Sequence, residues 1–174
     1  MRNTNWCVIT GAPCSGKTTV IRALAQAGYP VVHEAARRTI AAEIAAGRNP
    51  REIRRNPLAF QRRVLAAKLA EERRLPRSET VFIDRGIPDS IAYFRFHGLD
   101  PAAPLQHSRR FRYRRIFFFE RLPMVPDEIR HETPEAAARL DSLLLEAYRM
   151  LAYPVIPVPV LPVAARIHHI LERL

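Results

Sequence analysis

The sequence predicts an α/β fold in which helices cover both faces of a parallel sheet. Short apolar runs rich in β-branched residues alternate along the chain with stretches whose apolar residues recur at helical spacing. Glycines stand where several of these stretches end, as Gly28, Gly47 and Gly98 do. Because strands that alternate with helices form parallel sheets buried on both faces, we expect a three-layer sandwich.

The predicted elements follow one another in a regular order. Strands are expected where apolar residues run together, and helices where they recur every three or four positions. The expected strands span residues 6–10, 30–33, 80–84, 114–119 and 153–158. The expected helices span residues 17–27, 35–46, 58–75, 88–97, 101–109, 134–152 and 163–173. No repeat, linker or change in composition interrupts this order, so we expect a single domain over residues 1–174.

Composition excludes several classes of protein. A hydrophobic fraction of 48% is ordinary for a globular domain and argues against disorder. No apolar run approaches the roughly 20 residues that span a bilayer, and the first strand begins too early for a signal peptide to precede it. Two cysteines cannot supply a disulfide framework, so the expected location is the cytoplasm.

The net charge of +11 comes mainly from arginine. A basic chain attracts nucleic acid or anionic lipid, and residues 109–115 interleave arginine with aromatic side chains, as proteins that bind single strands do. The same stretch runs directly into a predicted strand, which is also typical of a solvated helix end. Polyanionic substrates or an arginine-rich genome explain the surplus as well, so nucleic-acid binding stays open without being favoured.

The run that begins at Gly11 reads G-x-x-x-x-G-K-T and links the first predicted strand to the first predicted helix. Glycines let backbone N–H groups turn inward, and the N-terminus of a helix favours an anion. Lys17 can reach the β- and γ-phosphates of a nucleotide, and the Thr18 hydroxyl can bind Mg²⁺. We therefore expect this phosphate loop to bind ATP or GTP through Gly11, Ala12, Pro13, Cys14, Ser15, Gly16, Lys17, Thr18 and Thr19.

Two acidic residues stand at the carboxyl ends of predicted strands, where open α/β sheets bind ligands. Asp84 follows the apolar run 80–83, an arrangement typical of the Walker B aspartate that holds Mg²⁺ directly or through water. Glu34 follows the second strand and can accept a proton from an acceptor hydroxyl. Both residues are also suited to capping the helix that comes next.

Residues 120–133 are predicted to form a flap, because prolines and mixed charges interrupt any regular pattern there. The flap carries Arg130. Phosphoryl transfer concentrates negative charge on the equatorial oxygens, and an arginine on a closing segment stabilises that charge while water is excluded. The alternative for Arg130 is an ordinary solvated side chain.

The stretch Asp84-Arg85-Gly86-Ile87-Pro88-Asp89-Ser90-Ile91-Ala92-Tyr93 resembles the D-R-Y-x-x-S-x-x-A-Y stretch of thymidylate kinases. Glu34 falls where those enzymes and the deoxynucleoside kinases have an acidic residue after their second strand. The order of these motifs along the chain resembles even more closely that of the predicted small ATPases of the AAA-domain group, which are related to the ribosylnicotinamide kinase domain of NadR. Those proteins carry comparable Glu-Ala-Ala-Arg and Asp-Arg-Gly-x-Pro-Asp stretches.

This resemblance implies a core sheet with strand order 2-3-1-4-5 and transfer of the γ-phosphate of ATP or GTP to an acceptor. It implies that Glu34 or Asp84 orients or deprotonates an acceptor hydroxyl, and that Arg85 contacts the acceptor or its phosphate. Gly86 and Asp89 replace the tyrosine and serine of thymidylate kinases, which disfavours a thymidylate acceptor. The flap lacks the glycine of the Asp-Gly-x-Arg pattern found in the AAA-domain group.

The leading hypothesis is therefore a kinase that uses Mg²⁺ and phosphorylates a nucleoside, nucleotide or similar metabolite. The alternative is a nucleotide-hydrolysing switch or binding module that acts on a protein or nucleic-acid partner, because a phosphate loop binds nucleotide whether or not an acceptor exists. The sequence leaves the choice between ATP and GTP and the oligomeric state open.

Overall fold

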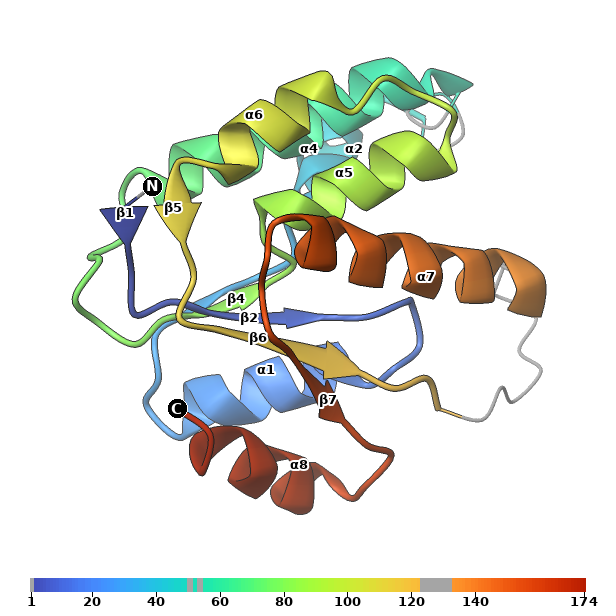
Figure 1. The fold of residues 1–174 in the computed structure, drawn as a ribbon. Coiled ribbons are helices and arrows are strands. Elements are labelled where there is room, and N and C mark those ends of the chain that lie inside the picture. The colour runs from blue at the N-terminus through green and yellow to red at the C-terminus, as the bar shows by residue number, and fades with distance from the viewer. Residues whose placement is uncertain (1, 50–51, 53–54, 123–132) are drawn as a thin grey trace.

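The protein is described by a computed structural model that covers residues 2–49, 52, 55–122 and 133–174. Its centre is a parallel sheet in the order β3-β4-β2-β6-β7, visible edge-on in Figure 1. The strands are β2 (Cys7–Thr10), β3 (Val31–Val32), β4 (Phe82–Asp84), β6 (Arg115–Phe119) and β7 (Val155–Val158). Counted along the chain within this sheet, the order is 2-3-1-4-5, as the resemblance implies.

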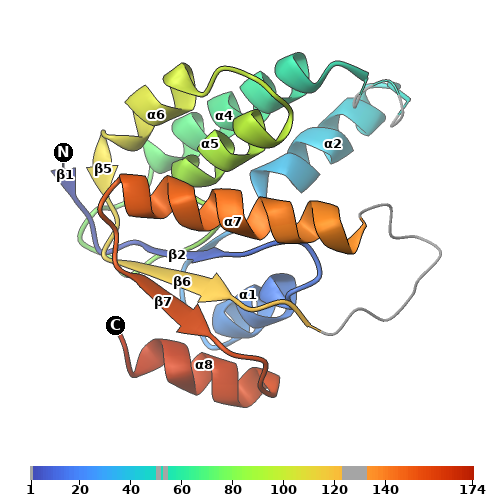
Figure 2. The same cartoon turned by 45° about the vertical axis from the view of Figure 1, so that its right-hand side comes forward.

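Helices cover both faces of the sheet and confirm the three-layer sandwich (Figures 1 and 2). One face carries α1 (Lys17–Gln26) and α8 (Val163–Leu171). The other carries α2 (Ala35–Ala45), α4 (Pro57–Glu72), α5 (Ile87–Phe96), α6 (Ala102–Ser108) and α7 (Pro134–Met150). Among the described helices, none combines the length and the apolar character that crossing a bilayer requires.

The core consists of two apolar clusters separated by the sheet. Along β6, Ile116 and Phe118 belong to the cluster under α5 and α7, whereas Phe117 and Phe119 belong to the cluster under α1 and α8. Successive side chains of a strand point to opposite faces. Because both faces are covered, the strand is an unbroken apolar run rather than an alternating one.

A second, two-stranded sheet was not predicted. In it β1 (Arg2–Asn3) pairs in parallel with β5 (Phe111–Arg112). Both strands are short and partly exposed, so neither has the apolar pattern by which a strand is recognised in a sequence. The pairing depends on the neighbouring strands β2 and β6, which bring the two segments side by side.

The carboxyl ends of the strands meet at one edge of the sheet, and the phosphate loop leaves β2 at this edge. Gly11 has a φ of 132°, and a Cβ atom there would lie 2.6 Å from the carbonyl oxygen of Phe119. Glycine is therefore required for the loop to pass against the end of β6. Of the predicted flap, only residues 120–122 and 133 are described, and Arg130 lies outside the described residues.

Candidate active site

A cavity of about 730 Å³ opens over the carboxyl ends of the strands. Residues 13–18 of the phosphate loop line it, together with side chains from α2, α4, α5 and α7. Glu34 and Arg85 also line this cavity, so the structure brings these predicted residues together with the loop. Thr19, the last of the predicted binding residues, is exposed on α1 and does not line the cavity.

Lys17 begins α1 and is held over the phosphate loop by two hydrogen bonds. Its Nζ donates to the carbonyl oxygen of Ala12 at 2.7 Å and to the Ser15 hydroxyl at 2.8 Å. Burial, reinforced by the Arg85 guanidinium, lowers the pKa of Lys17 to about 7. A bound phosphate would stabilise the charged form of this ammonium group and offer it stronger acceptors.

The first peptide of the loop is held from both sides by side chains of other elements. The carboxylate of Asp141 on α7 accepts a hydrogen bond from the N–H of Ala12 at 2.7 Å. Arg85 donates from the other direction to the carbonyl oxygen of Gly11 at 3.1 Å. Because the N–H and C=O groups of a trans peptide point in opposite directions, these two bonds determine how this peptide faces. Asp141 also pairs with Arg121, whose Nε lies 2.9 Å from its carboxylate.

Arg166 of α8 orients a later peptide of the same loop. Its Nη1 donates to the carbonyl oxygen of Ser15 at 2.7 Å, so the N–H of Gly16 points away from α8. Gly16 has a φ of 82°, a left-handed conformation that favours glycine, and a Cβ atom there would also lie 2.9 Å from this Nη1. Nothing in the sequence singled out Arg166, because one arginine on a terminal helix carries no signal in so arginine-rich a chain.

Glu34 and Arg85 form an ion pair at the adjoining side of the cavity. The Nε of Arg85 lies 3.1 Å from Glu34 Oε1, and the Nε of Arg37 lies 3.1 Å from Glu34 Oε2. Burial raises the pKa of Glu34, but the charges of Arg85 and Arg37 outweigh that effect and leave the pKa below its usual value. Although Glu34 stands at the N-cap position of α2, its side chain makes no capping hydrogen bond.

Asp84 ends β4 and is buried beside the phosphate loop. Its pKa is raised, because burial outweighs the attraction of Arg85. Within the described part of the chain, Asp84 Oδ1 is buried without a hydrogen-bond partner. Buried carboxylate oxygens are normally satisfied, so this one fits a Mg²⁺ ion or a water bound to it. Thr18 lines the cavity, whereas Asp84 does not, and the Thr18 hydroxyl would complete the protein's share of such a site.

Helix α4 contributes residues that no pattern in the sequence indicated. Gln61, Val64 and Lys68 lie on one face of this helix and line the cavity. Gln61 is 4% exposed and makes no hydrogen bond to any described residue. The Nζ of Lys68 donates to the carbonyl oxygen of Gly86 at 2.8 Å and contacts the Ser90 hydroxyl at 3.4 Å. Polar residues on the buried face of a helix are expected at a binding site rather than in a core.

A phosphate loop between a central parallel strand and a helix, with an acidic residue at the end of the adjacent strand, defines a P-loop nucleotide-binding protein. Sequence comparison agrees: the chain belongs to the AAA domain family, whose model matches residues 6–166. No curated protein sequence matches the chain significantly.

Solved structures of P-loop kinases share this fold. The NadR protein in complex with NR superimposes with a TM-score of 0.70 at 18% identity over 98% of this chain, which spans 50% of the NadR chain. Thymidylate kinase from Ehrlichia chaffeensis has a TM-score of 0.69 at 12% identity, with 98% and 97% of the two chains covered. Deoxyadenosine kinase from M. mycoides has a TM-score of 0.66 at 14% identity, with 96% and 97% covered. At such identities the likeness concerns the fold.

Proposed function

We propose that this protein transfers the γ-phosphate of ATP or GTP to a small acceptor of the nucleoside, nucleotide or related metabolite type. The observation that carries the proposal is the shared cavity, in which the phosphate loop, the Glu34–Arg85 pair and one face of α4 meet. A volume of about 730 Å³ is that of a small-molecule site. The fold is also that of deoxyadenosine and thymidylate kinases.

The donor nucleotide would be held by the phosphate loop. Backbone N–H groups of the loop and the start of α1 receive the phosphates, and Lys17 neutralises charge on the β- and γ-phosphates. Thr18 and Asp84 would hold Mg²⁺, which would reduce the negative charge on the phosphates. The protein's own contribution is to position the nucleotide and to stabilise the charge that develops during transfer.

The acceptor would lie between the Glu34–Arg85 pair and α4. A carboxamide offers one acceptor and a donor side by side, so the unpartnered Gln61 suits the edge of a heteroaromatic ring or an amide. Phe60, Tyr93 and Phe96 line the same cavity and provide flat apolar surfaces for such a ring. These features favour a nucleoside-like acceptor over a protein or nucleic-acid partner.

The test is to follow γ-labelled ATP and GTP, with Mg²⁺, in the presence of nucleosides, nucleotides and related metabolites. Label on an organic acceptor is the expected result. If the label appears only as inorganic phosphate whatever acceptor is added, the nucleotide-hydrolysing switch replaces the kinase.

A further inference from the structure

The chain uses lysine only in the candidate active site. Of its 28 lysine and arginine residues, all but Lys17 and Lys68 are arginines. Both lysines line the same cavity. Lysine and arginine are not interchangeable, because an ammonium group is a compact point charge and a guanidinium group is a broad planar one. A lysine at position 68 therefore suggests a task for which arginine is unsuitable.

Lys68 is 7% exposed, and no carboxylate of the described residues lies within ion-pair distance of its Nζ. The carboxylates whose charges act on it are already bound elsewhere. Asp89 accepts hydrogen bonds from Thr10 and Tyr148 and pairs with Arg85. A buried ammonium group without a bound anion is costly, and one that lines a cavity can obtain an anion from a ligand.

Glu72 and Glu34 are the other carboxylates whose charges act on Lys68. Glu72 accepts a hydrogen bond from the Tyr113 hydroxyl at 2.7 Å and does not line the cavity. Glu34 lines the cavity, but its two oxygens pair with Arg85 and Arg37. The nearby protein carboxylates therefore leave the charge of Lys68 available to a molecule in the cavity.

We propose that Lys68 and Arg85 bind an anionic group of the acceptor, a phosphate or a carboxylate, and that an oxygen of this group is the nucleophile. The inference rests on the proposed kinase function and narrows its acceptor. Arg85 and Glu34 line the same cavity as Lys17 and Lys68, so the proposed anion site and the site for the donor phosphates share one cavity.

The chemical step follows from this arrangement. An oxygen of the anionic group forms a bond to the γ-phosphorus, while the bond from that phosphorus to the β–γ bridging oxygen breaks. The electron pair of the broken bond leaves with the nucleoside diphosphate. No proton has to be removed from such a nucleophile. The absence of a proton to remove agrees with the environment of Glu34, because a carboxylate held in ion pairs with Arg85 and Arg37 is a weak proton acceptor.

The spacing along α4 favours a nucleoside monophosphate. Gln61 and Lys68 are seven residues apart on one face of the helix, which corresponds to about 10 Å along its axis. A molecule that reaches both residues needs a hydrogen-bonding ring at one end and an anionic group at the other. Nucleoside monophosphates have this form, and so do nucleoside 5′-carboxylates.

The deciding experiment compares nucleosides, their 5′-monophosphates and their 5′-carboxylates as acceptors of label from γ-labelled ATP. We expect the wild-type kcat/KM for an anionic acceptor to exceed that for the parent nucleoside by about 100-fold or more. Comparing transfer to the monophosphates with transfer to the carboxylates shows which anionic group acts as the nucleophile. Equal or better transfer to nucleosides overturns the inference and leaves the kinase proposal standing. Label released only as inorganic phosphate overturns the kinase proposal and the inference with it.

Variants on α4 test the residue itself. Lys68→Met should raise the KM for the anionic acceptor by about 30-fold or more while the affinity for a non-hydrolysable ATP analogue stays unchanged. Arg62→Met removes an exposed positive charge from the same helix and should change neither quantity. An unchanged acceptor KM in Lys68→Met overturns the role of Lys68. The wild-type comparison of acceptors does not depend on the folding of either variant.

Discussion

At Ser15, one hydrogen bond determines which way a peptide of the phosphate loop faces. The carbonyl oxygen of Ser15 points to Arg166, and the N–H of Gly16 is therefore presented on the opposite side. Arg166 is 2% exposed, and its Nε and Nη2 have no hydrogen-bond partner among the described residues. Its charge is thus held close to the loop with little water around it. Such a charge adds to the attraction for a phosphate.

We predict that Arg166→Met weakens the binding of ADP and ATP by about 10- to 100-fold, the range expected when a hydrogen bond from a charged group is lost. AMP should bind as it does to the wild type, because it lacks the β-phosphate that a phosphate loop cradles. Titration calorimetry measures all three affinities. Arg22→Met, which removes an exposed arginine on α1, is the matched control. An equal loss for AMP would contradict the prediction.

Asp84 provides a second test at the scale of one residue. Asp84→Asn keeps the shape of the side chain and removes the charge that favours Mg²⁺. We predict that Mg²⁺ strengthens ADP binding to the wild type but has little effect on the variant, whereas metal-free affinities stay similar. Fluorescence titration with a labelled ADP, with and without Mg²⁺, measures both effects. A full Mg²⁺ effect in the variant would show that Asp84 does not hold the ion.

At the scale of the elements, α4 links the cavity to the interior. The helix starts at Pro57 after Asn56, whose side chain accepts a hydrogen bond from the N–H of Ala59. Further along, Glu72 accepts a hydrogen bond from Tyr113, and the same hydroxyl accepts one from the N–H of Ile87 at the start of α5. A polar connection thus joins α4, α5 and the segment before β6.

Glu72 makes the stability of this connection depend on pH. Burial raises its pKa from the usual 4.5 to about 7. Between these values the folded protein binds more protons than the unfolded chain, so the free energy of unfolding falls as pH rises through this window. The full effect is about 3 kcal/mol. We predict that Glu72→Gln, which stays neutral and can still accept from Tyr113, removes this dependence.

Urea unfolding at pH 5 and pH 8 measures the effect of Glu72→Gln. The variant should resemble the wild type at pH 5 and be the more stable protein at pH 8. Identical pH dependence in the two proteins would mean that Glu72 is ionised in the folded state.

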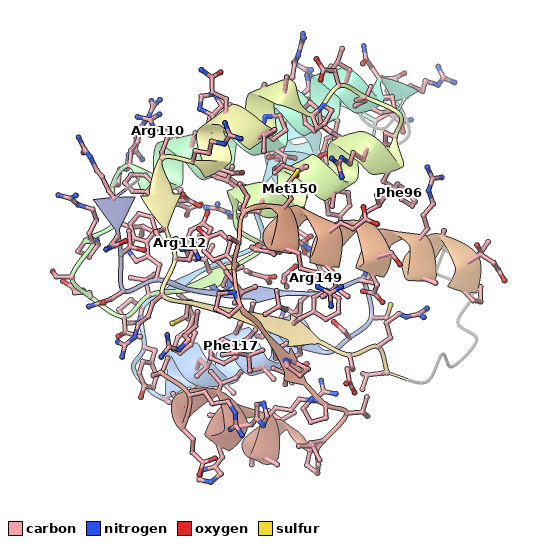
Figure 3. All side chains as sticks on the ribbon, viewed as in Figure 1. Phe96, Arg110, Arg112, Phe117, Arg149 and Met150 are labelled. Atoms are coloured by element: carbon pink, nitrogen blue, oxygen red, sulfur yellow. The ribbon has the colours of Figure 1, made fainter. Side chains whose placement is uncertain are left out.

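At the scale of the molecule, several arginines lie near the amino ends of the strands. Backbone hydrogen bonds hold arginine-bearing segments against the N-terminal segment: Arg2 with Arg110, Asn5 with Arg77, and Trp6 with Arg114. These arginines precede their strands, whereas the phosphate loop follows β2. Because the strands are parallel, the arginines lie at the end of the sheet opposite to the cavity. Figure 3 shows Arg110 and Arg112 on the other side of the molecule from Phe96, which lines the cavity. The excess of arginine is therefore not explained by the candidate active site.

Nucleotide binding should stabilise the whole molecule, because the loop joins β2 to α1 and is held by α7 and α8. At a nucleotide concentration about 100 times Kd, the gain is about 2.7 kcal/mol, or about 5–10 °C in Tm for a chain of this size. We predict that MgADP raises the Tm of the wild type by this amount and that Lys17→Ala loses most of the shift at the same concentration. Thermal unfolding of both proteins with and without MgADP measures the shift in Tm. An equal shift in the variant would show that Lys17 does not contribute to nucleotide binding.

Local patterns were sufficient to predict most of the fold. The apolar run before Gly11, the helical spacing after Lys17 and the glycines at helix ends depend only on neighbours in the chain. The phosphate loop and Asp84 were predicted for the same reason, since the loop directly follows one recognisable strand and Asp84 ends another. The strand order, which the family resemblance rather than local patterns implied, agrees with the structure. The roles of Glu34, Asp84 and Arg85 remain predictions.

Residues whose partners are distant in the chain could be identified only in the folded structure. Asp141 and Arg166 reach the phosphate loop across more than a hundred positions, and no local pattern records such a contact. Gln61 and Lys68 looked like ordinary polar positions of a helix until packing buried them against the cavity. The sequence by itself determined the elements and the loop that binds phosphate, because these follow from short-range periodicity and backbone geometry. The tertiary structure decided which side chains orient that loop and which line the cavity proposed for the acceptor, because those contacts exist only once the sheet and its two helical layers are assembled.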